Sequence, residues 1–223
     1  MSIFNKNTEK PKTVINTGRA DLRKYTPEAL RKIKIINAGV IILPKEATPE
    51  FMEAYSRIVK NTGSEKFLSS NENIVTISGI SEFNCQNTNI DPIYEISGIN
   101  VLTNCKTETP VRVILSGICA YESDNNFQFE ELSGISHAVD FKIEHVITFS
   151  KDAEINGEFF EELKENTVIL CGKDLTFKSD VDKNMLKNRN IYFLAGKDII
   201  CPKSIIGIIQ TMATAGKEII EDD

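Results

Sequence analysis

The sequence predicts a mainly β repeat protein, a parallel β-solenoid with coils of about 19–24 residues and short helices on its N- and C-terminal repeats. Three observations support this fold. The tetrapeptide Ile/Leu-Ser-Gly-Ile occurs four times in the middle of the chain, apolar and polar residues alternate around each copy, and looser copies continue toward both ends. A near-constant period of this length indicates stacked units, each of which buries its apolar face only against its neighbours.

The four central copies are ISGI at 77–80, ISGI at 96–99, LSGI at 115–118 and LSGI at 132–135, and their glycines are 19, 19 and 17 residues apart. A glycine between two short alternating runs allows a positive φ or a close approach of backbones. Each unit is therefore predicted to be a strand, a bend and a second strand. With the looser copies IINAGVII, VILCGKDL and YFLAGKDI included, the bend glycines are Gly39, Gly79, Gly98, Gly117, Gly134, Gly172 and Gly196.

One long stretch of the chain is nearly duplicated. Residues 190–203, NIYFLAGKDIICPK, repeat the pattern of residues 166–179, NTVILCGKDLTFKS, without a gap. Neighbouring coils would present the same strand, bend and strand to each other. We expect the Lys-Asp pairs of the two copies, 173–174 and 197–198, to stack on one edge and neutralise each other.

The outer repeats are longer, and their extra residues predict short helices. TPEALRKI at 26–33 and TPEFMEAYSRIVKN at 48–61 both begin with Thr-Pro-Glu. Threonine as N-cap, proline in the first turn and an acid beside it are typical of helix starts. GEFFEEL at 157–163 and DVDKNMLKN at 180–188 predict two further helices.

A strand, a bend and a returning helix over 22–24 residues resemble the unit of leucine-rich repeats. This resemblance covers about residues 23–73 and 140–212 and concerns period and layout, because the family's LxxLxLxxN consensus is absent. The central part is similar in layout to the β-coils of bactofilins. Neither resemblance implies a functional residue.

We expect residues 1–22 to form a disordered basic arm and residues 23–223 to form a single solenoid domain. Within that domain, residues 23–73 would be N-terminal cap repeats, 74–145 central β-coils and 146–223 helix-containing C-terminal repeats. Solenoids need atypical terminal repeats to close their ends, which suits the segment RADLRKYTPEALRKI.

The net charge of −6 is unevenly distributed, with nine Lys/Arg and three Asp/Glu in residues 1–34 and an acidic middle. The acidic middle disfavours nucleic acid as a partner, because it repels phosphates. The basic residues either cover the first coil or contact the acidic body of another subunit. They are Arg19, Arg23, Lys24, Arg31, Lys32 and Lys34.

The cysteines and the N-terminus suggest a location. An odd number of widely spaced cysteines without CxxC indicates free thiols in a reducing compartment. The polar N-terminus has no signal-peptide h-region, and no apolar run is long enough to span a membrane. We expect a cytoplasmic protein without membrane contact. The cysteines are Cys85, Cys105, Cys119, Cys171 and Cys201.

The sequence supplies no convincing catalytic, cofactor or metal site. His137 and His145 could flank Asp140 and Glu144, but this spacing matches no known metal site. GxSxG, GxxxxGK[ST] and GxGxxG do not occur. No catalytic, cofactor-binding or metal-ligating residue is therefore assigned.

The best-supported function is a non-catalytic scaffold for protein interaction or self-assembly, with a protein partner that could be a second copy. The alternative is a carbohydrate-binding or carbohydrate-active protein that uses an acidic face. The acids of that face are Asp91, Glu95, Glu122, Asp124, Glu130 and Glu131, and its candidate stacking rings are Tyr94, Tyr121, Phe127 and Phe129.

Overall fold

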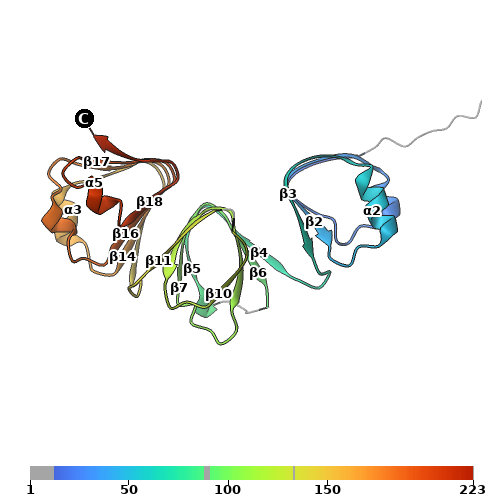
Figure 1. Cartoon of the computed structure of the whole chain (residues 1–223), viewed down its shortest axis with the longest axis horizontal. Helices are drawn as coiled ribbons and strands as arrows, with labels where there is room; N and C mark the ends of the chain where they lie inside the picture. The colour runs from blue at the N-terminus through green and yellow to red at the C-terminus, as the bar shows by residue number, and fades with distance from the viewer. Residues whose placement is uncertain (1–12, 88–90, 133, 223) are drawn as a thin grey trace, which may run out of the picture. The chain divides into compact units, whose positions relative to one another are not determined.

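The computed structural model describes residues 13–87, 91–132 and 134–222. The protein is mainly β, with 49% strand and 14% helix, and every strand pair among the described residues is parallel. Contacts group the chain into two compact units, unit 1 over residues 1–72 and unit 2 over residues 73–223 (Figure 1). This boundary divides the single domain that was expected over residues 23–223.

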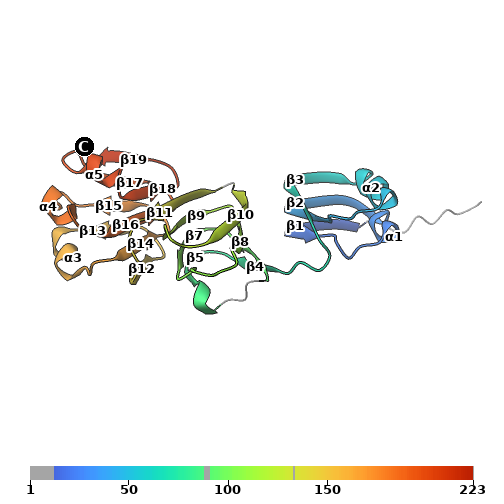
Figure 2. The same cartoon turned by 60° about the horizontal axis from the view of Figure 1, so that its bottom comes forward.

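Unit 1 contains one three-stranded sheet with the order β1-β2-β3, and two short helices on the connections (Figure 2). The helices lie beside each other, and α2 buries Phe51, Ala54 and Tyr55. The elements in chain order are β1 (Thr13–Asp21), α1 (Pro27–Leu30), β2 (Ile33–Pro44), α2 (Pro49–Ser56) and β3 (Val59–Leu68).

The predicted helix starts of unit 1 are confirmed. Thr26 Oγ1 accepts a hydrogen bond from the amide of Ala29 at 3.3 Å, and Thr48 Oγ1 accepts one from the amide of Phe51 at 3.2 Å. Proline follows both caps, as the first-turn preference requires. The short polar signature therefore fixed where both helices begin.

The disordered arm expected over residues 1–22 is wrong for its described part. Residues 13–21 form β1, which pairs with β2 from Thr13 to Asp21. The physical reason is that Ala20 and the following Leu22 are buried, and Ile15 packs against the same core. Residues 1–12 of the expected arm lie outside the described residues.

The first part of unit 2 is a stack of four coils, each contributing one strand to each of two sheets. Sheet B has the order β10-β8-β6-β4, and sheet C has the order β11-β9-β7-β5. The strands are β4 (Ile74–Ile77), β5 (Ile80–Asn84), β6 (Ile93–Ile96), β7 (Ile99–Thr103), β8 (Val111–Leu115), β9 (Ile118–Glu122), β10 (Phe127–Leu132) and β11 (Ile135–Val139), and the 3₁₀ helix η1 (Cys85–Asn87) follows β5. We call these coils the central stack.

The second part of unit 2 is also a stack of four coils, here called the C-terminal stack. Sheet D has the order β12-β14-β16-β18, and sheet E has the order β13-β15-β17-β19. The elements are β12 (His145–Phe149), β13 (Ala153–Ile155), α3 (Gly157–Glu162), β14 (Thr167–Cys171), β15 (Leu175–Phe177), α4 (Lys183–Leu186), β16 (Ile191–Ala195), β17 (Ile199–Pro202), α5 (Ile206–Ile209), β18 (Ala213–Ala215) and β19 (Ile219–Asp222).

The strands of unit 2 thus form two stacks where one continuous run was expected. Sheet C is apolar on its outer face as well as its inner face, and Val101 and Ala120 on that outer face are fully buried. Sheet D covers this face with Val168 and Leu170. Covering an apolar face releases more free energy than lengthening a single stack that leaves the face in water.

The two stacks of unit 2 meet coil by coil. A Cβ atom on Gly172 would lie 2.6 Å from Ile80 Cδ1, and one on Gly196 would lie 2.8 Å from Ile99 Cδ1. In the third pair, a Cβ atom on Gly216 would lie 3.1 Å from Ile118 Cδ1. The last isoleucine of the first three Ser-Gly-Ile copies therefore packs onto a glycine of the other stack, whereas Ile135 of the fourth copy is exposed.

Candidate functional site: the open strand edges

The two histidines are not brought together as a metal or acid-base pair. His137 on β11 stacks on the ring of Tyr192 on β16, with ring centroids 4.4 Å apart and an interplanar angle of 14°. Burial lowers the pKa of His137, and the charge of Asp140 opposes this shift. His145 begins β12. Within the described residues, no three His, Cys, Asp or Glu side chains gather closely enough to hold a metal ion.

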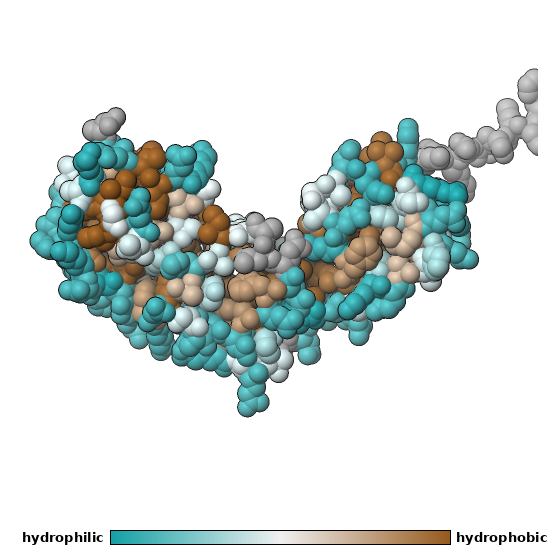
Figure 3. All heavy atoms as spheres, in the orientation of Figure 1, coloured by the Kyte–Doolittle hydropathy of each residue, from teal (hydrophilic) through white to brown (hydrophobic). Residues whose placement is uncertain are grey.

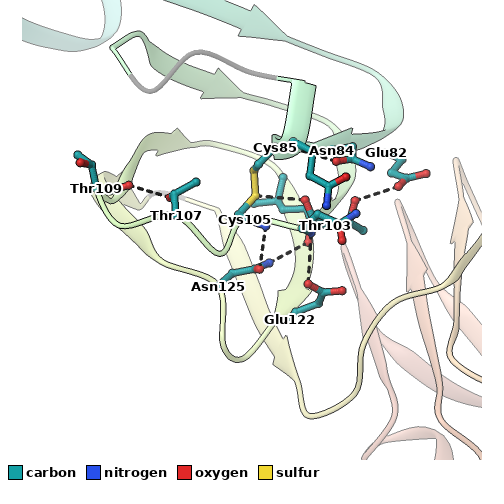
Figure 4. The surroundings of a disulfide bond; sticks show 12 residues. Glu82, Asn84, Cys85, Thr103, Cys105, Thr107, Thr109, Glu122 and Asn125 are labelled. Carbon is teal, nitrogen blue, oxygen red and sulfur yellow. Dashed lines mark hydrogen bonds between the residues drawn. A yellow bond between two sulfur atoms is a disulfide. The ribbon is translucent and has the colours of Figure 1, made fainter.

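The candidate acidic face is not a set of free carboxylates. Glu122 is buried, and one of its oxygens accepts a hydrogen bond from the amide of Asn104 at 3.2 Å (Figure 4). The other oxygen accepts a hydrogen bond from the amide of Ile143 at 2.9 Å. Such a carboxylate stabilises the connection between the stacks and cannot reach a ligand in solvent.

The other candidate acids are scattered and mostly paired. Asp124 forms an ion pair with Lys106, and Glu130 lies 2.6 Å from Arg112 Nε. Glu95 accepts a hydrogen bond from Thr76 Oγ1 at 3.2 Å. Asp91 is exposed, and the side chain of Glu131 lies outside the described residues.

The four candidate stacking rings belong to the core of the central stack. Tyr94 is buried and packs on Phe83 with ring centroids 4.8 Å apart. Tyr121 packs on Phe127 and Phe129 at 5.5 and 5.9 Å. Tyr121, Phe127 and Phe129 are partly buried and pack against the same core between sheets B and C, so the four rings serve its packing.

The expectation of five free thiols is wrong. Cys85 and Cys105 form a disulfide whose Cα atoms are 4.9 Å apart (Figure 4). They are 20 residues apart and follow β5 and β7, so the stacking of neighbouring coils brings them together. The inference of a reducing compartment loses its premise. The remaining cysteines, Cys119, Cys171 and Cys201, are free and buried.

Burial makes these three thiols poor nucleophiles. It raises the pKa of Cys119 to about 12 and that of Cys201 to about 11, and it also raises the pKa of Cys171. The thiolate is the reactive form of cysteine, so none of the three is activated.

The basic cluster is partly structural. Arg23 Nη1 donates to the carbonyl oxygens of Ser69 at 2.9 Å and Glu72 at 2.7 Å, while its other nitrogens bind Asp21. This hydrogen bonding lowers the pKa of the Asp21 carboxyl. Arg31 pairs with Glu28, Arg19 is partly buried, and Lys24, Lys32 and Lys34 are exposed. The guanidinium of Arg23 therefore ties the segment after β3 to the end of β1.

The repeat glycines lie in columns along the stacks. Gly79 and Gly98 have φ of 94° and 91°, and a Cβ on Gly98 would lie 2.2 Å from the oxygen of Gly79. A Cβ on Gly117 would lie 2.2 Å from the oxygen of Gly98, and one on Gly134 would lie 2.0 Å from the oxygen of Gly117. Gly172 lies over Ser150, and Gly196 lies over Gly172. Gly39 approaches Gly18, but it lies inside the continuous strand β2 and makes no bend that divides it.

The stacked Lys-Asp pairs are also present, with each lysine facing the acid of the preceding coil. Lys173 lies 4.0 Å from Asp152, and Lys197 lies 4.0 Å from Asp174. Asp174 Oδ1 also accepts a hydrogen bond from the amide of Asp198 at 3.1 Å. This charged edge is therefore neutralised internally.

Exposed apolar side chains concentrate where the stacks end. Among the described residues, six of the seven large apolar side chains in solvent lie on a first or last strand of a sheet. In Figure 3 apolar side chains reach the surface of both units, including the part of unit 2 that carries α5 and β17. The six are Val14 on β1, Val59 and Phe67 on β3, Val75 on β4, Ile135 on β11 and Ile220 on β19.

The first coil of the C-terminal stack carries an apolar hollow. It measures about 400 Å³ and lies between β12 and α3. Its lining combines apolar side chains with two carboxylates at the rim, Glu158 and Glu162. The apolar lining consists of Ile147, Phe159 and Leu163.

The edge strands of unit 1 share a five-residue motif. Residues 14–18 read VINTG and residues 59–63 read VKNTG. Their asparagines align with Asn37 of β2 in a ladder, in which Asn37 Nδ2 donates to Asn16 Oδ1 at 2.5 Å and Asn61 Nδ2 donates to Asn37 Oδ1 at 2.7 Å. A search for Val-x-Asn-Thr-Gly would have shown that the outer strands match each other more closely than the middle strand.

Comparisons of the chain with protein-family models, with curated proteins and with solved structures find no match. No helix among the described residues is long and apolar enough to cross a membrane. The function must therefore be argued from the surfaces described above.

Proposed function

We propose that the protein is a non-catalytic scaffold of β-solenoid type that associates with other protein chains, including copies of itself, through the ends of its strand stacks. The observation that carries this proposal is the concentration of exposed apolar side chains on the first and last strands. An edge strand presents unpaired backbone groups to which another chain can add.

The solenoid and its layout, in which short helices alternate with strands as in leucine-rich repeats, are part of the proposal. Support comes from sheet orders in which each coil adds one strand to each of two sheets, and from the glycine and Lys-Asp columns. Repeat architectures of this kind act through extended surfaces and stackable ends.

The carbohydrate-directed alternative has no specific observation in its favour. Its rings pack in a core, and the buried Glu122 is committed to two backbone amides. A sugar site needs exposed rings and free polar groups that converge on one cavity.

The proposal is tested by measuring the mass of the full chain by light scattering after size exclusion, over a range of concentrations and at low and high salt. We expect a mass that increases with concentration, because addition of chains to open edges obeys mass action. High salt should leave apolar strand addition intact, whereas an arm-to-body ion contact would dissociate. A monomer at all concentrations, together with no protein bound in a pull-down, would contradict the proposal.

A further inference from the structure

We propose that unit 1 joins head to tail with unit 1 of a second copy, so that β3 of one copy pairs in parallel with β1 of the next. This inference rests on the proposed self-assembly and names the surface that carries it. The partner is a second copy of this chain, and the contact is the addition of a strand to an open edge.

The register of the existing sheet predicts how the two edges would meet. Among the described residues, β1 and β3 each pair only with β2. Asn16 aligns with Asn37, and Asn37 aligns with Asn61. Continuing by one strand places Asn61 opposite Asn16 of the second copy. The same register places like residues together over the motif, Val59 on Val14, Thr62 on Thr17 and Gly63 on Gly18.

The asparagine ladder has a direction that such pairing continues. Each asparagine amide nitrogen donates to the side-chain oxygen of the preceding strand, from Asn61 to Asn37 and from Asn37 to Asn16. At the two ends, Asn16 Nδ2 and Asn61 Oδ1 remain to complete the pattern. Asn16 Nδ2 of a second copy would donate to Asn61 Oδ1, and stacked asparagines of this kind stabilise parallel, in-register strands.

The exposed valines of the motif lie where this contact would bury them. Val14 is 47% exposed and Val59 is 56% exposed, and both align with Ile35 of the middle strand. Ile35, which has a strand on each side, is only partly exposed. Pairing of the edges would therefore give the two valines the environment that Ile35 already has, with the gain expected from apolar burial.

Two charged residues on β3 limit the strength of this contact. Lys60 and Glu65 align with the buried Ile36 and Ile41 of β2, so they point toward the interior position of the last coil. Both contact Tyr55: its hydroxyl donates to Glu65 Oε1 at 2.5 Å, and Lys60 Nζ lies 4.3 Å from its ring centroid. Inward charges are one way in which proteins blunt edge strands.

A head-to-tail contact uses two different surfaces and leaves both free at the ends of the assembly. Such heterologous contacts form open chains unless the rotation closes a ring. The inference therefore predicts a series of oligomers that lengthens with concentration, and it excludes a dimer as the end point unless the copies close.

The first test is Asn16→Asp in the full chain. A carboxylate at position 16 still accepts from Asn37 Nδ2, so the ladder within unit 1 is retained, but it has no hydrogen to donate to Asn61 of a second copy. We expect the concentration for half-assembly to increase at least about tenfold. Asn184→Asp, an equal charge change at an exposed position of α4, should leave that concentration unchanged.

The second test is crosslinking between Val14→Cys in one sample and Val59→Cys in another. Within one chain β2 separates these positions by two strand spacings, about 9.6 Å, which exceeds the reach of a disulfide. On mixing under mild oxidation we expect a covalent dimer, and a chain carrying both changes should give a ladder of oligomers. Phe67→Cys, also exposed on β3 but out of register, should not crosslink with Val14→Cys.

The outcomes separate this inference from the proposed function. The inference is overturned if the wild type associates but no crosslink forms between positions 14 and 59 and Asn16→Asp assembles at the same concentration as the wild type. Assembly would then use another strand edge. A wild type that remains monomeric overturns self-assembly altogether. A 14–59 crosslink together with weakened assembly of Asn16→Asp supports both.

Discussion

The glycine columns of unit 1 and of the central stack look alike in sequence but differ in structure. In unit 1, Gly39 lies inside β2, a single strand of 12 residues, and a Cβ there would meet the oxygen of Gly18 at 2.9 Å. In the central stack, Gly98 has a φ of 91°, a Cβ there would lie 2.2 Å from the oxygen of Gly79, and the chain is divided between strands of sheets B and C.

This difference shows that a glycine column specifies close stacking of coils but does not by itself specify whether the coil turns. The strand β2 continues through Gly39, whereas the positive φ of Gly98 accompanies a turn into a second sheet. Gly117 divides β8 from β9 without a φ in this region. Unit 1 therefore has one curved sheet closed by helices, and the central stack has two facing sheets with its core between them.

The largest expected effect that tests this comparison comes from alanine at a glycine with positive φ. Gly98→Ala combines the strain of a left-handed L-residue with an overlap against Gly79, and should destabilise unit 2 by about 4 kcal/mol. Gly18→Ala has nothing within 4 Å of the new Cβ and should change the stability of unit 1 by less than about 0.5 kcal/mol. Hydrogen exchange resolved by peptide reports each unit separately. Equal losses of stability in Gly98→Ala and Gly18→Ala would contradict a strained bend at Gly98.

A smaller effect is expected from the crosslink that only the central stack carries. The Cys85–Cys105 disulfide closes a loop of 20 residues, so its reduction should destabilise the central stack by about 2–3 kcal/mol. Amide exchange of residues 74–139 should increase after reduction, while exchange in unit 1 should not change. Cys85→Ala combined with Cys105→Ala provides the control, because added reductant should then have no further effect.

The smallest effect is expected at the seam between the two stacks of unit 2. Burial lowers the pKa of His137 below its ordinary value of 6.5, so the unfolded chain binds a proton more readily than the folded one. This contribution to stability is complete above about pH 6.5 and is lost as the pH falls toward the folded pKa. The ring is partly exposed, so the loss should stay below about 1 kcal/mol.

The variant that isolates this contribution is His137→Phe, which keeps a ring against Tyr192 but cannot be protonated. When the pH is lowered from 7.5 to 5.5, the Tm of the wild type should decrease more than the Tm of the variant. Parallel shifts in the two proteins would contradict a role for His137.

Several features of the fold could be predicted from local sequence. The alternating runs beside Gly98 and Gly117 became strands, and Thr26 and Thr48 cap helices as expected. These predictions depend only on the chain within a few residues. The same applies to the Lys-Asp columns, because equal spacing in a repeat places equal residues on one edge.

Predictions that depended on distant contacts were less successful. The absence of a local motif predicts that Cys85 and Cys105 are free thiols, yet they meet through the stacking of neighbouring coils. Glu122 was read as exposed, but the amides of Asn104 and Ile143 hold it in the interior. In each case the decisive partner lies 18 to 21 residues away.

The sequence by itself determined the period, the strands, the helix starts and the glycine columns, because each follows from short-range sterics and hydrogen bonding repeated along the chain. Only the tertiary structure decided that β1 joins a sheet, that unit 2 folds as two stacks rather than one, and that Glu122 and the candidate rings pack inward. The physical reason is that a repeat specifies how one coil contacts the next, whereas burial of the remaining apolar faces depends on the whole assembly of coils.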